Sequence, residues 1–434
     1  MTNKFTLLFF ICSVLLMSGC QQESSSSSSV KNNASELGHV YTYQKQTLEA
    51  PLLDPASCVD YTRSCKIEEL PFITMSYPNP QIADVMTRVV VSHDWMGQRF
   101  QSLLAVMPNE ILTLLGSVTA IVIADNIRPS FYWTGSGAIY LDPASLWLTN
   151  AEKDTINQAP DYRNGFSSGL SYDFFHRFVK NGQSAYQYYS LTSNTERTID
   201  DIIIPMASLL FHELAHANDF MPSTLMPSLI ADKPLWSEIN RFSNIQLSEK
   251  LKQGYPISDN TLKAHAAVLY LGQAATEDQK SQSADYLGLL MQQEGANHLY
   301  AYSHQAEDVA MLFQATMLNY YYGIEMDSAF VIKPETDNPT CADYIIAWGQ
   351  RNRIADATSK PRAQFVSQQI LTNIDLTDFF NQLGEAQYFP ALSNWCSNQL
   401  SAPVVTNKNA ERAKPTRLLN IRKDHHHGAI TAFQ

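Results

Sequence analysis

The sequence predicts an α+β protein with a small mixed sheet, a long apolar helix and a mainly helical part after it. Residues 119–124 form an apolar, β-rich run, and a second short strand is expected between the glycines at 135–137 and Pro143. An apolar run that begins at Ile202 indicates a helix that must lie in a core, and helical spacing dominates residues 234–330.

The segments around this sheet are assigned from spacing and composition. Residues 31–79 are rich in proline and are expected to form an irregular N-terminal wrap. Apolar residues recur at helical spacing through residues 82–90, and residues 95–107 indicate a second helix. Residues 151–198 are rich in Asn, Ser, Gly and Tyr, which predicts a long surface excursion.

The most specific chemical signal is the sequence His-Glu-Leu-Ala-His at residues 212–216. On an α-helix His212 and His216 lie one turn apart on the same face, so both imidazoles can converge on one zinc ion (Zn2+). Glu213 is placed to take a proton from a zinc-bound water rather than to bind the metal. Proline is common in the first turn of a helix, so Pro205 is expected to lie near the start of the helix that carries the motif. The alternative is a buried helix with two hydrogen-bonded histidines.

A catalytic zinc site needs a third protein ligand and keeps one position open for water. The longer pattern HExxHxxGxxH is absent, because Asp219 and Pro222 stand where the glycine and the last histidine would be. Two glutamates are candidates. Glu238 lies near the spacing of thermolysin-type enzymes, but Phe242 occupies the position of their expected aspartate. Glu307 lies much farther along the chain.

The segment around Glu307 resembles the third-ligand helix of the lethal-factor-like gluzincins, which are HExxH zinc metallopeptidases. The positions that match in register are Tyr300, Ala301, Ala306, Glu307, Ala310 and Phe313. The resemblance implies that Glu307 binds zinc and that Tyr300 stabilises the oxyanion of the tetrahedral intermediate. Asp308 and Val309 depart from the usual aromatic residues, and Met311 stands where the family often has a second acid.

The resemblance covers two short segments and implies a zincin-like fold. In that fold the last strand before the metal helix lies along the substrate cleft, so the strand before Pro143 is expected to bind a substrate backbone by strand addition. The roles that the resemblance implies for two residues have alternatives. Tyr300 could be a packing residue, and Glu307 could be a solvated carboxylate on a helix. Asp219 and Asp308 could each orient a ligand histidine. Three other histidines are expected to be surface or packing residues: His265, His298 and His304.

The N-terminus is typical of an exported lipoprotein. A basic region at Lys4 precedes an apolar stretch, residues 7–16, that is too short to span a membrane comfortably. The ending Met-Ser-Gly-Cys resembles a bacterial lipobox, in which Cys20 is lipidated, although leucine is commoner than methionine there. Gln21 resembles the residues that let a lipoprotein reach the outer membrane, and the serines at 24–29 predict a flexible tether. A plain signal peptide or an uncleaved anchor is the alternative.

Four further cysteines remain in the exported part, and an even number in an exported chain suggests disulfides. Proximity favours pairing Cys58 with Cys65 and Cys341 with Cys396, although four cysteines allow three connectivities. The sequence divides into four parts: a signal peptide at 1–19, the lipidated Cys20 and its tether at 20–45, a zincin-like metallopeptidase domain at 46–330 with an insertion near 240–295, and a C-terminal region at 331–434 that contains a disulfide.

These features predict a zinc-dependent peptidase, a hydrolase anchored by lipid in the bacterial cell envelope as an outer-membrane lipoprotein. Glu213 would be the general base and Tyr300 the transition-state donor. The alternative is a catalytically silent lipoprotein that keeps the zincin-like fold as a binding or assembly module. The expected partner is a peptide or protein substrate. The net charge of −12 argues against nucleic acid, and membrane contact is expected only through the lipid.

Overall fold

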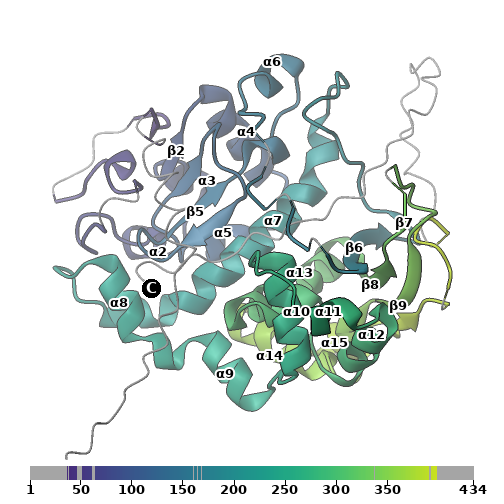
Figure 1. Cartoon of the computed structure of the whole chain (residues 1–434). Coiled ribbons are helices and arrows are strands. Elements are labelled where there is room, and N and C mark those ends of the chain that lie inside the picture. The colour runs from purple at the N-terminus through teal and green to yellow at the C-terminus, as the bar shows by residue number, and fades with distance from the viewer. Residues whose placement is uncertain are drawn as a thin grey trace, which may run out of the picture.

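The computed structural model describes residues 37, 39–45, 51–60, 64–159, 161–163, 165–167, 169–336, 338–390 and 392–397 (Figure 1). The predicted signal peptide, Cys20 and the serine tether lie outside the described residues. Two small sheets and a set of helices make up the described part, which confirms the α+β class. No helix in these ranges combines the length and the apolar character needed to cross a membrane.

The first sheet is mixed and has the strand order β1-β2-β3-β5-β4. Its strands are β1 (Tyr41–Thr42), β2 (Val89–Val91), β3 (Ile121–Ile123), β4 (Phe131–Trp133) and β5 (Ala138–Leu141). Strands β2, β3 and β5 run parallel, and β1 and β4 pair antiparallel at the two edges. The central strands are buried apolar runs, as expected for parallel strands covered on both faces.

Helices accompany this sheet at α2 (Ile73–Ser76), α3 (Ile82–Met86), α4 (Asp94–Leu104), α5 (Glu110–Leu115) and α6 (Asn150–Lys153). The helix expected through residue 90 ends at Met86, and Val89–Val91 form β2 instead. Three consecutive β-branched residues suit a fully buried strand, and their tertiary pairing with β3 overrides the local helical spacing.

The expectation that the strand before Pro143 is an exposed edge, free to pair with a substrate backbone, is wrong. That strand is β5, which lies inside the sheet between β3 and β4. The edge belongs to β4, a strand of three residues that the sequence analysis did not identify. Tyr132 of β4 stacks on Phe220 with ring centroids 5.7 Å apart, so this edge strand faces the metal-motif helix.

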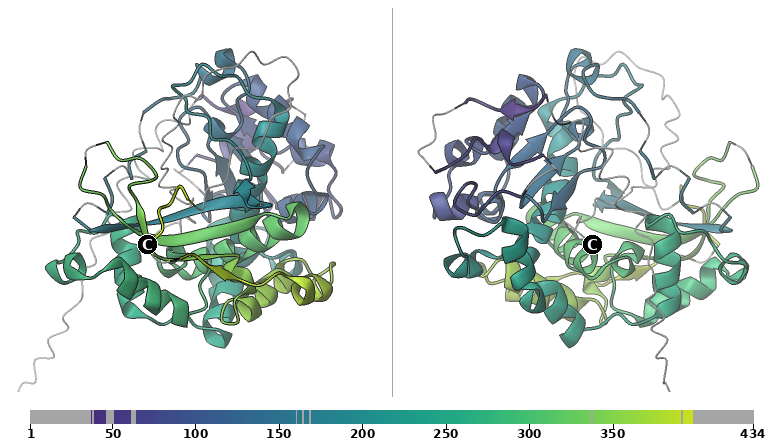
Figure 2. Two further views of the ribbon diagram at one scale, coloured as in Figure 1. Left: turned by 90° about the vertical axis from the view of Figure 1, so that its right-hand side faces the viewer. Right: turned by 60° about the vertical axis from the view of Figure 1, so that its left-hand side comes forward.

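That helix is α7 (Ile199–Phe220), which has a capping box formed by Thr198 and Asp201. It begins earlier than expected, so Pro205 lies inside the helix rather than at its start. One side of α7 contacts β4, β5 and α5, and another packs along α13 (Gln305–Tyr322). Figures 1 and 2 show α7 between the first sheet and the remaining helices.

The part after α7 is mainly helical, in agreement with the sequence. Its helices before α13 are α8 (Leu235–Arg241), α9 (Leu247–Gly254), α10 (Asn260–Tyr270), α11 (Glu277–Ser281) and α12 (Ala284–Gln293). A single 3-10 turn, η5 (Leu299–Tyr302), connects this group to α13. Two later helices are α14 (Lys360–Ile370), which packs on α13 and α9, and α15 (Thr377–Gln382).

The second sheet is antiparallel and has the order β10-β9-β8-β6-β7. Its strands are β6 (Tyr172–Lys180), β7 (Gln183–Ser184), β8 (Glu325–Ile332), β9 (Ile345–Arg351) and β10 (Gln387–Tyr388). The prediction of a surface excursion over 151–198 is wrong at β6, whose residues pair along β8 from Tyr172–Ile332 to Val179–Glu325. The boundary expected before residue 331 falls inside β8, which pairs with both β6 and β9.

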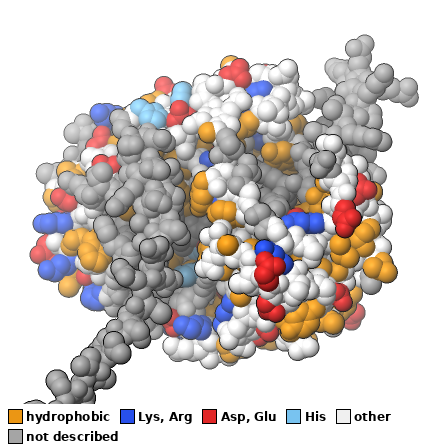
Figure 3. Space-filling view, in the orientation of Figure 1, with side chains coloured by type: hydrophobic (Ala, Val, Ile, Leu, Met, Phe, Trp, Pro, Cys, Tyr) orange, Lys and Arg blue, Asp and Glu red, His pale blue; other side chains and the backbone are white. Residues whose placement is uncertain are grey.

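The second sheet is covered on both faces. Tyr172 and Phe174 pack with α10 and α12, whereas Phe175 on the opposite face packs with Tyr344 and Trp395 (Figure 2). This arrangement explains why β6 carries large side chains on both faces. Acidic, basic and apolar side chains are interspersed over the described part of the face drawn in Figure 3.

Two disulfides join residues that are close in space. Cys58 and Cys65 have Cα atoms 5.6 Å apart, and Cys341 and Cys396 have Cα atoms 5.2 Å apart. These are the pairings that proximity in the sequence favours. Disulfides persist in oxidising compartments, so the two bonds are typical of a location outside the cytoplasm.

Candidate metal centre

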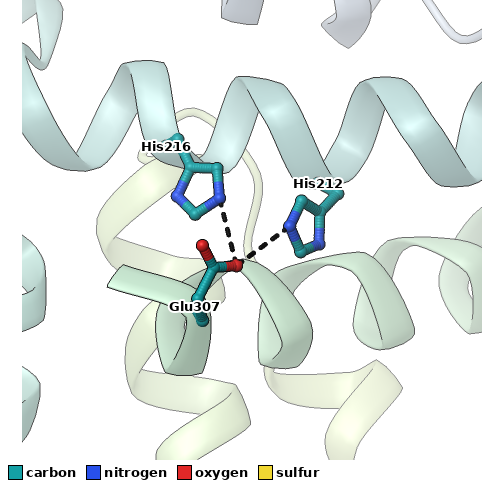
Figure 4. Close-up of side chains that lie close together, drawn as sticks. All are labelled: His212, His216 and Glu307. Atoms are coloured by element: carbon teal, nitrogen blue, oxygen red, sulfur yellow. Dashed lines mark hydrogen bonds and ion pairs between the residues drawn. The ribbon is translucent and has the colours of Figure 1, made fainter. Parts of the chain in front are cut away.

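The two histidines of the motif lie on one face of α7 and point the same way (Figure 4). Their ring centroids are 4.9 Å apart and the rings are nearly perpendicular, at 84°. Both side chains are buried, His212 with 1% and His216 with 0% of its surface exposed. The helical spacing therefore creates the pair of converging imidazoles that the sequence predicts.

Glu307 of α13 completes the group. Its Oε2 lies 3.2 Å from Nε2 of His212 and 3.3 Å from Nε2 of His216 (Figure 4). One ligand atom from each of the three residues can be chosen so that all lie within 4.8 Å of one another. The structure thus brings together the two histidines and the glutamate that the family resemblance singled out, as a buried group that could hold a metal ion.

Contacts between α7 and α13 hold this geometry. Phe211, which directly precedes the motif on α7, packs edge-on against Phe313 of α13 with ring centroids 6.2 Å apart. Gln314 donates a hydrogen bond from Nε2 to Oγ of Ser208 at 2.7 Å. At the start of α13, Nδ1 of His304 accepts a hydrogen bond from the backbone N–H of Ala306, so His304 caps the helix that carries Glu307.

Glu238, the other candidate for the third ligand, binds other groups of the protein. Its carboxylate forms an ion pair with Arg241 on the same helix, and Oε2 accepts the backbone N–H of Ile230 at 2.9 Å. The hydrogen bond from Arg241 keeps the pKa of Glu238 below its usual value. Glu238 is not part of the metal-competent group found among the described residues.

The protonation of the three ligands reflects their burial and proximity. Burial opposes ionisation of Glu307, but the charge on His216 and hydrogen bonds from both histidines outweigh it and hold the pKa of Glu307 well below its usual range. Burial lowers the pKa of His216, although Glu307 works against this. A carboxylate and a neutral imidazole are the forms in which these side chains bind metals.

Glu213 lies on α7 beside the two histidines and is completely buried. Burial raises its pKa well above the usual value, and the nearby charge of Glu307 adds to the rise. Two groups favour the charged form, the backbone amide of Tyr132 in β4 and the guanidinium of Arg163. Within the described residues neither Glu213 oxygen makes a hydrogen bond of normal geometry.

Tyr132 and Arg163 are neighbours of Glu213 that could not be recognised from the sequence. Arg163 is buried and pairs with Asp161 through contacts that include a 2.6 Å distance from Nη2 to Oδ2. Both residues reach Glu213 through tertiary folding, from an edge strand and from a segment outside the regular elements. Neither carries a local motif that could have revealed this position.

Tyr300 lies in the turn η5, and its ring is stacked over that of His212 at 6.4 Å and 20°. It also packs against Tyr270 of α10, with ring centroids 4.9 Å apart. Burial raises the pKa of the Tyr300 hydroxyl well above its usual value, and Glu307 and Glu213 raise it further. Tyr300 is therefore a neutral phenol beside the metal-competent group, as well as a packing residue.

The two aspartates considered as partners of the ligand histidines are engaged in other contacts. Oδ1 of Asp219 accepts the backbone N–H of Ser248 at 2.7 Å, at the start of α9. Asp308 forms a buried ion pair with Arg362 of α14. Nδ1 of His216 has no hydrogen-bond partner among the described residues, so neither aspartate orients this ring directly.

The other two histidines considered in the sequence are buried and are not members of the ligand group found among the described residues. His265 contacts the Tyr172 hydroxyl through Nδ1 and Oε1 of Gln282 through Nε2, the latter at 2.7 Å. His298 caps the turn η5 by accepting the backbone N–H of Tyr300 at its Nδ1. Both are therefore packing histidines with defined hydrogen bonds, as expected.

The donor set suits a zinc ion. Two ligands bound tetrahedrally at about 2.1 Å from zinc are separated by roughly 3.4 Å, close to the 3.2 and 3.3 Å between the histidine nitrogens and Glu307. Nε2 of His216 is buried without a hydrogen bond of normal geometry among the described residues, so it is available as a ligand. Two imidazoles and one carboxylate form a borderline donor set of the kind that catalytic zinc sites use.

Comparison of the chain with protein-family models, with curated proteins and with solved structures finds no match. The geometry of these residues is therefore the basis on which a function can be proposed.

Proposed function

We propose that this protein is a zinc-dependent peptidase of the gluzincin type. The observation that carries the proposal is the convergence of His212, His216 and Glu307 beside a buried Glu213 and a neutral Tyr300. The three proposed ligands leave a fourth position of a tetrahedral ion to water or substrate, which is the property that separates catalytic from structural zinc sites.

Each residue of the group has a distinct role in the proposed hydrolysis. When bound, zinc supplies Lewis acidity, which polarises a carbonyl and lowers the pKa of water. Glu213, which is not a ligand, accepts the proton of the attacking water and passes it to the leaving amine. Tyr300 donates a hydrogen bond to the oxygen that gains negative charge as the carbonyl becomes tetrahedral.

The raised pKa of Glu213 supports its role as a proton carrier. A carboxylate with the usual pKa is a weak base toward water and is rarely protonated near neutral pH, whereas a proton carrier works best when its pKa lies near the operating pH. Burial and the charge of Glu307 both favour the protonated form of Glu213. A bound cation would oppose this shift, so the loaded site would place the pKa of Glu213 lower than the ligand-free site does.

We further propose that the protein is an outer-membrane lipoprotein anchored through Cys20, which agrees with the two disulfides. The lipobox-like ending at Cys20 and the serine tether after it support this attachment. A tether of this composition would hold the folded part near the membrane without constraining its orientation.

The test is cleavage of a mixed peptide library by protein that begins after the serine tether, before and after removal of metal with a chelator. The expected result is cleavage that chelation abolishes and added zinc restores, and that the Glu213→Gln variant does not perform although it retains zinc. Zinc retention with no cleavage of any peptide by the wild type would overturn the proposal. That result would favour a catalytically silent binding or assembly module.

A further inference from the structure

The turn that presents Tyr300 is held by a chain of two histidines from different elements. His298 precedes η5, and its Nδ1 accepts the backbone N–H of Tyr300 at 2.9 Å. Nε2 of His298 lies 3.2 Å from Nδ1 of His176, which belongs to β6 of the second sheet. The second sheet is thereby connected through hydrogen-bonding side chains to the residue beside the metal-competent group.

The hydrogen-bond chemistry fixes the protonation of His298. A backbone N–H can only donate, so Nδ1 of His298 must present its lone pair to Tyr300. A neutral imidazole with a bare Nδ1 carries its proton on Nε2, which then donates to Nδ1 of His176. The surroundings favour this neutral form, because burial lowers the pKa of His298 well below its usual value and His176 and His212 lower it further.

His298 is enclosed by aromatic rings that leave it little freedom to rotate. Its ring packs edge-on against Phe174 at 4.7 Å and against His176 at 4.9 Å, and lies 6.2 Å from the ring of Tyr270. Tyr270 also packs against Tyr300. A displaced His298 would therefore disturb Tyr300 through the backbone hydrogen bond and through this shared neighbour.

The residue before His298 is tied down as well. Nδ2 of Asn297 donates to the backbone oxygen of Met311 in α13 at 2.8 Å. The backbone oxygen of Asn297 accepts Oγ–H of Ser328 in β8 at 3.2 Å. The segment that enters η5 is thus attached both to the helix that carries Glu307 and to the second sheet, which fixes the direction from which Tyr300 approaches His212.

We propose that His298 is the positioning residue for Tyr300, and that His176 keeps His298 in the tautomer that can accept the Tyr300 amide. This rests on the proposed function, in which Tyr300 donates to the developing oxyanion. The helical spacing of a motif cannot provide this donor, because Tyr300 lies outside α7 and α13. A small error in its place would remove most of its benefit, since transition-state donors act only in the correct geometry.

The experiment compares two substitutions at His298 with Tyr300→Phe. His298→Leu keeps much of the volume but removes the acceptor, whereas His298→Asn restores a carbonyl oxygen of the kind that caps helix N-termini. His265→Leu is the matched control, because His265 is also a buried, doubly hydrogen-bonded histidine but does not contact η5 through any hydrogen bond described for it. Turnover, KM and zinc content are measured for each variant, together with hydrogen exchange at residues 298–303.

The expected result is that His298→Leu lowers kcat by about the factor seen in Tyr300→Phe, with KM and zinc content unchanged. The double variant should be no slower than Tyr300→Phe alone, because His298 acts through Tyr300. Exchange of the Tyr300 amide should accelerate in His298→Leu, stay slow in α7, and return toward the wild-type rate in His298→Asn. His265→Leu should leave both kcat and η5 exchange unchanged.

Additive losses in the double variant, or wild-type exchange at Tyr300 in His298→Leu, would overturn the proposal. An equal effect of His265→Leu on η5 exchange would also overturn it, because the loss would then reflect general loosening of the helical part. The exchange measurement needs no substrate. If the wild type cleaves no peptide, the proposed function fails, while the exchange rates still decide whether His298 holds Tyr300.

Discussion

Nε2 of His212 lies 3.2 Å from Oε2 of Glu307, although 95 residues separate the two in sequence. The contact exists because α7 and α13 pack along each other over much of their lengths. Both helices are buried on several sides, so the distance between the two side chains is set by core packing rather than by a flexible loop. A site held in this way can keep its geometry before a metal binds.

The first prediction is that the protein binds one zinc ion per chain through the histidine pair. His212→Ala and His216→Ala should each abolish zinc retention, because either change leaves too few ligands for a stable site. Elemental analysis of purified protein measures this directly. Thermal unfolding provides a second readout, since zinc that binds only the folded state should raise the Tm of the wild type and not of the variants. Full zinc occupancy in both variants would disprove the assignment.

The second prediction distinguishes the two glutamates. Glu307→Ala should reduce zinc affinity strongly, whereas Glu238→Ala should leave it nearly unchanged because Glu238 pairs with Arg241. Zinc titration of metal-free protein by calorimetry measures both affinities. Glu238→Ala also serves as the control for removal of a buried carboxylate. Loss of affinity in Glu238→Ala alone would return the chain to a thermolysin-like ligand set.

The histidine pair could be predicted from the sequence because it is a local feature. Two residues four apart on a helix share a face whatever the rest of the fold does. Glu307 could not be found by spacing alone, since its approach depends on how α13 packs against α7. A resemblance to a known third-ligand helix identified it, and the structure places it within 3.3 Å of both histidines.

The elements that the sequence did not reveal depend on long-range pairing. Strand β4 has three residues, too few to show a period, and it is defined by its pairing with β5. Strand β6 lies in a segment rich in polar residues, where its apolar side chains alternate only in part and are covered on both faces. The alternation of Tyr172, Phe174 and Phe178 was the one signal that could have indicated this strand.

The third prediction concerns the disulfide between Cys341 and Cys396. The two cysteines are 55 residues apart, and in the chain-entropy treatment a closed loop of this size stabilises the folded state by roughly 4 kcal/mol. Replacing both cysteines by alanine should lower the free energy of unfolding by about this amount, measured by urea denaturation. Peptide mapping without reduction should recover this pair, and the Cys58–Cys65 pair separately. Free thiols at all four positions in protein from the cell envelope would contradict export.

The fourth prediction is that Asp219 makes stability fall as pH rises. Burial raises the pKa of Asp219 from 3.8 to about 7, despite hydrogen bonds from Ser248 and Leu247. Between these two values the folded state binds more protons at this site than the unfolded state does, so its contribution is full below about pH 4 and is lost as the pH rises through about 7. The buried carboxylate then becomes a charge without a cationic partner described for it.

The variant Asp219→Asn tests this dependence, because its side-chain oxygen can still accept the Ser248 amide while no charge can form. The variant and the wild type should have similar free energies of unfolding near about pH 4, and the variant should be more stable near about pH 8 by an amount on the order of a few kcal/mol. The control is Asp232→Asn, at an exposed aspartate. A difference between variant and wild type that does not change with pH would contradict the prediction.

The fifth prediction separates the proposed base from the proposed transition-state donor. Glu213→Gln keeps the length and shape of the side chain but cannot accept the proton, so kcat should fall by about two orders of magnitude or more. Zinc content should stay at the wild-type level, because Glu213 is not in the ligand group. Tyr300→Phe removes one hydroxyl that acts only as the oxyanion forms, so it should produce a smaller fall in kcat with little change in KM.

Steady-state kinetics on one cleaved peptide, with elemental analysis of the same samples, measures these quantities. Full activity in Glu213→Gln on a peptide that the wild type cleaves would show that Glu213 is not the catalytic base.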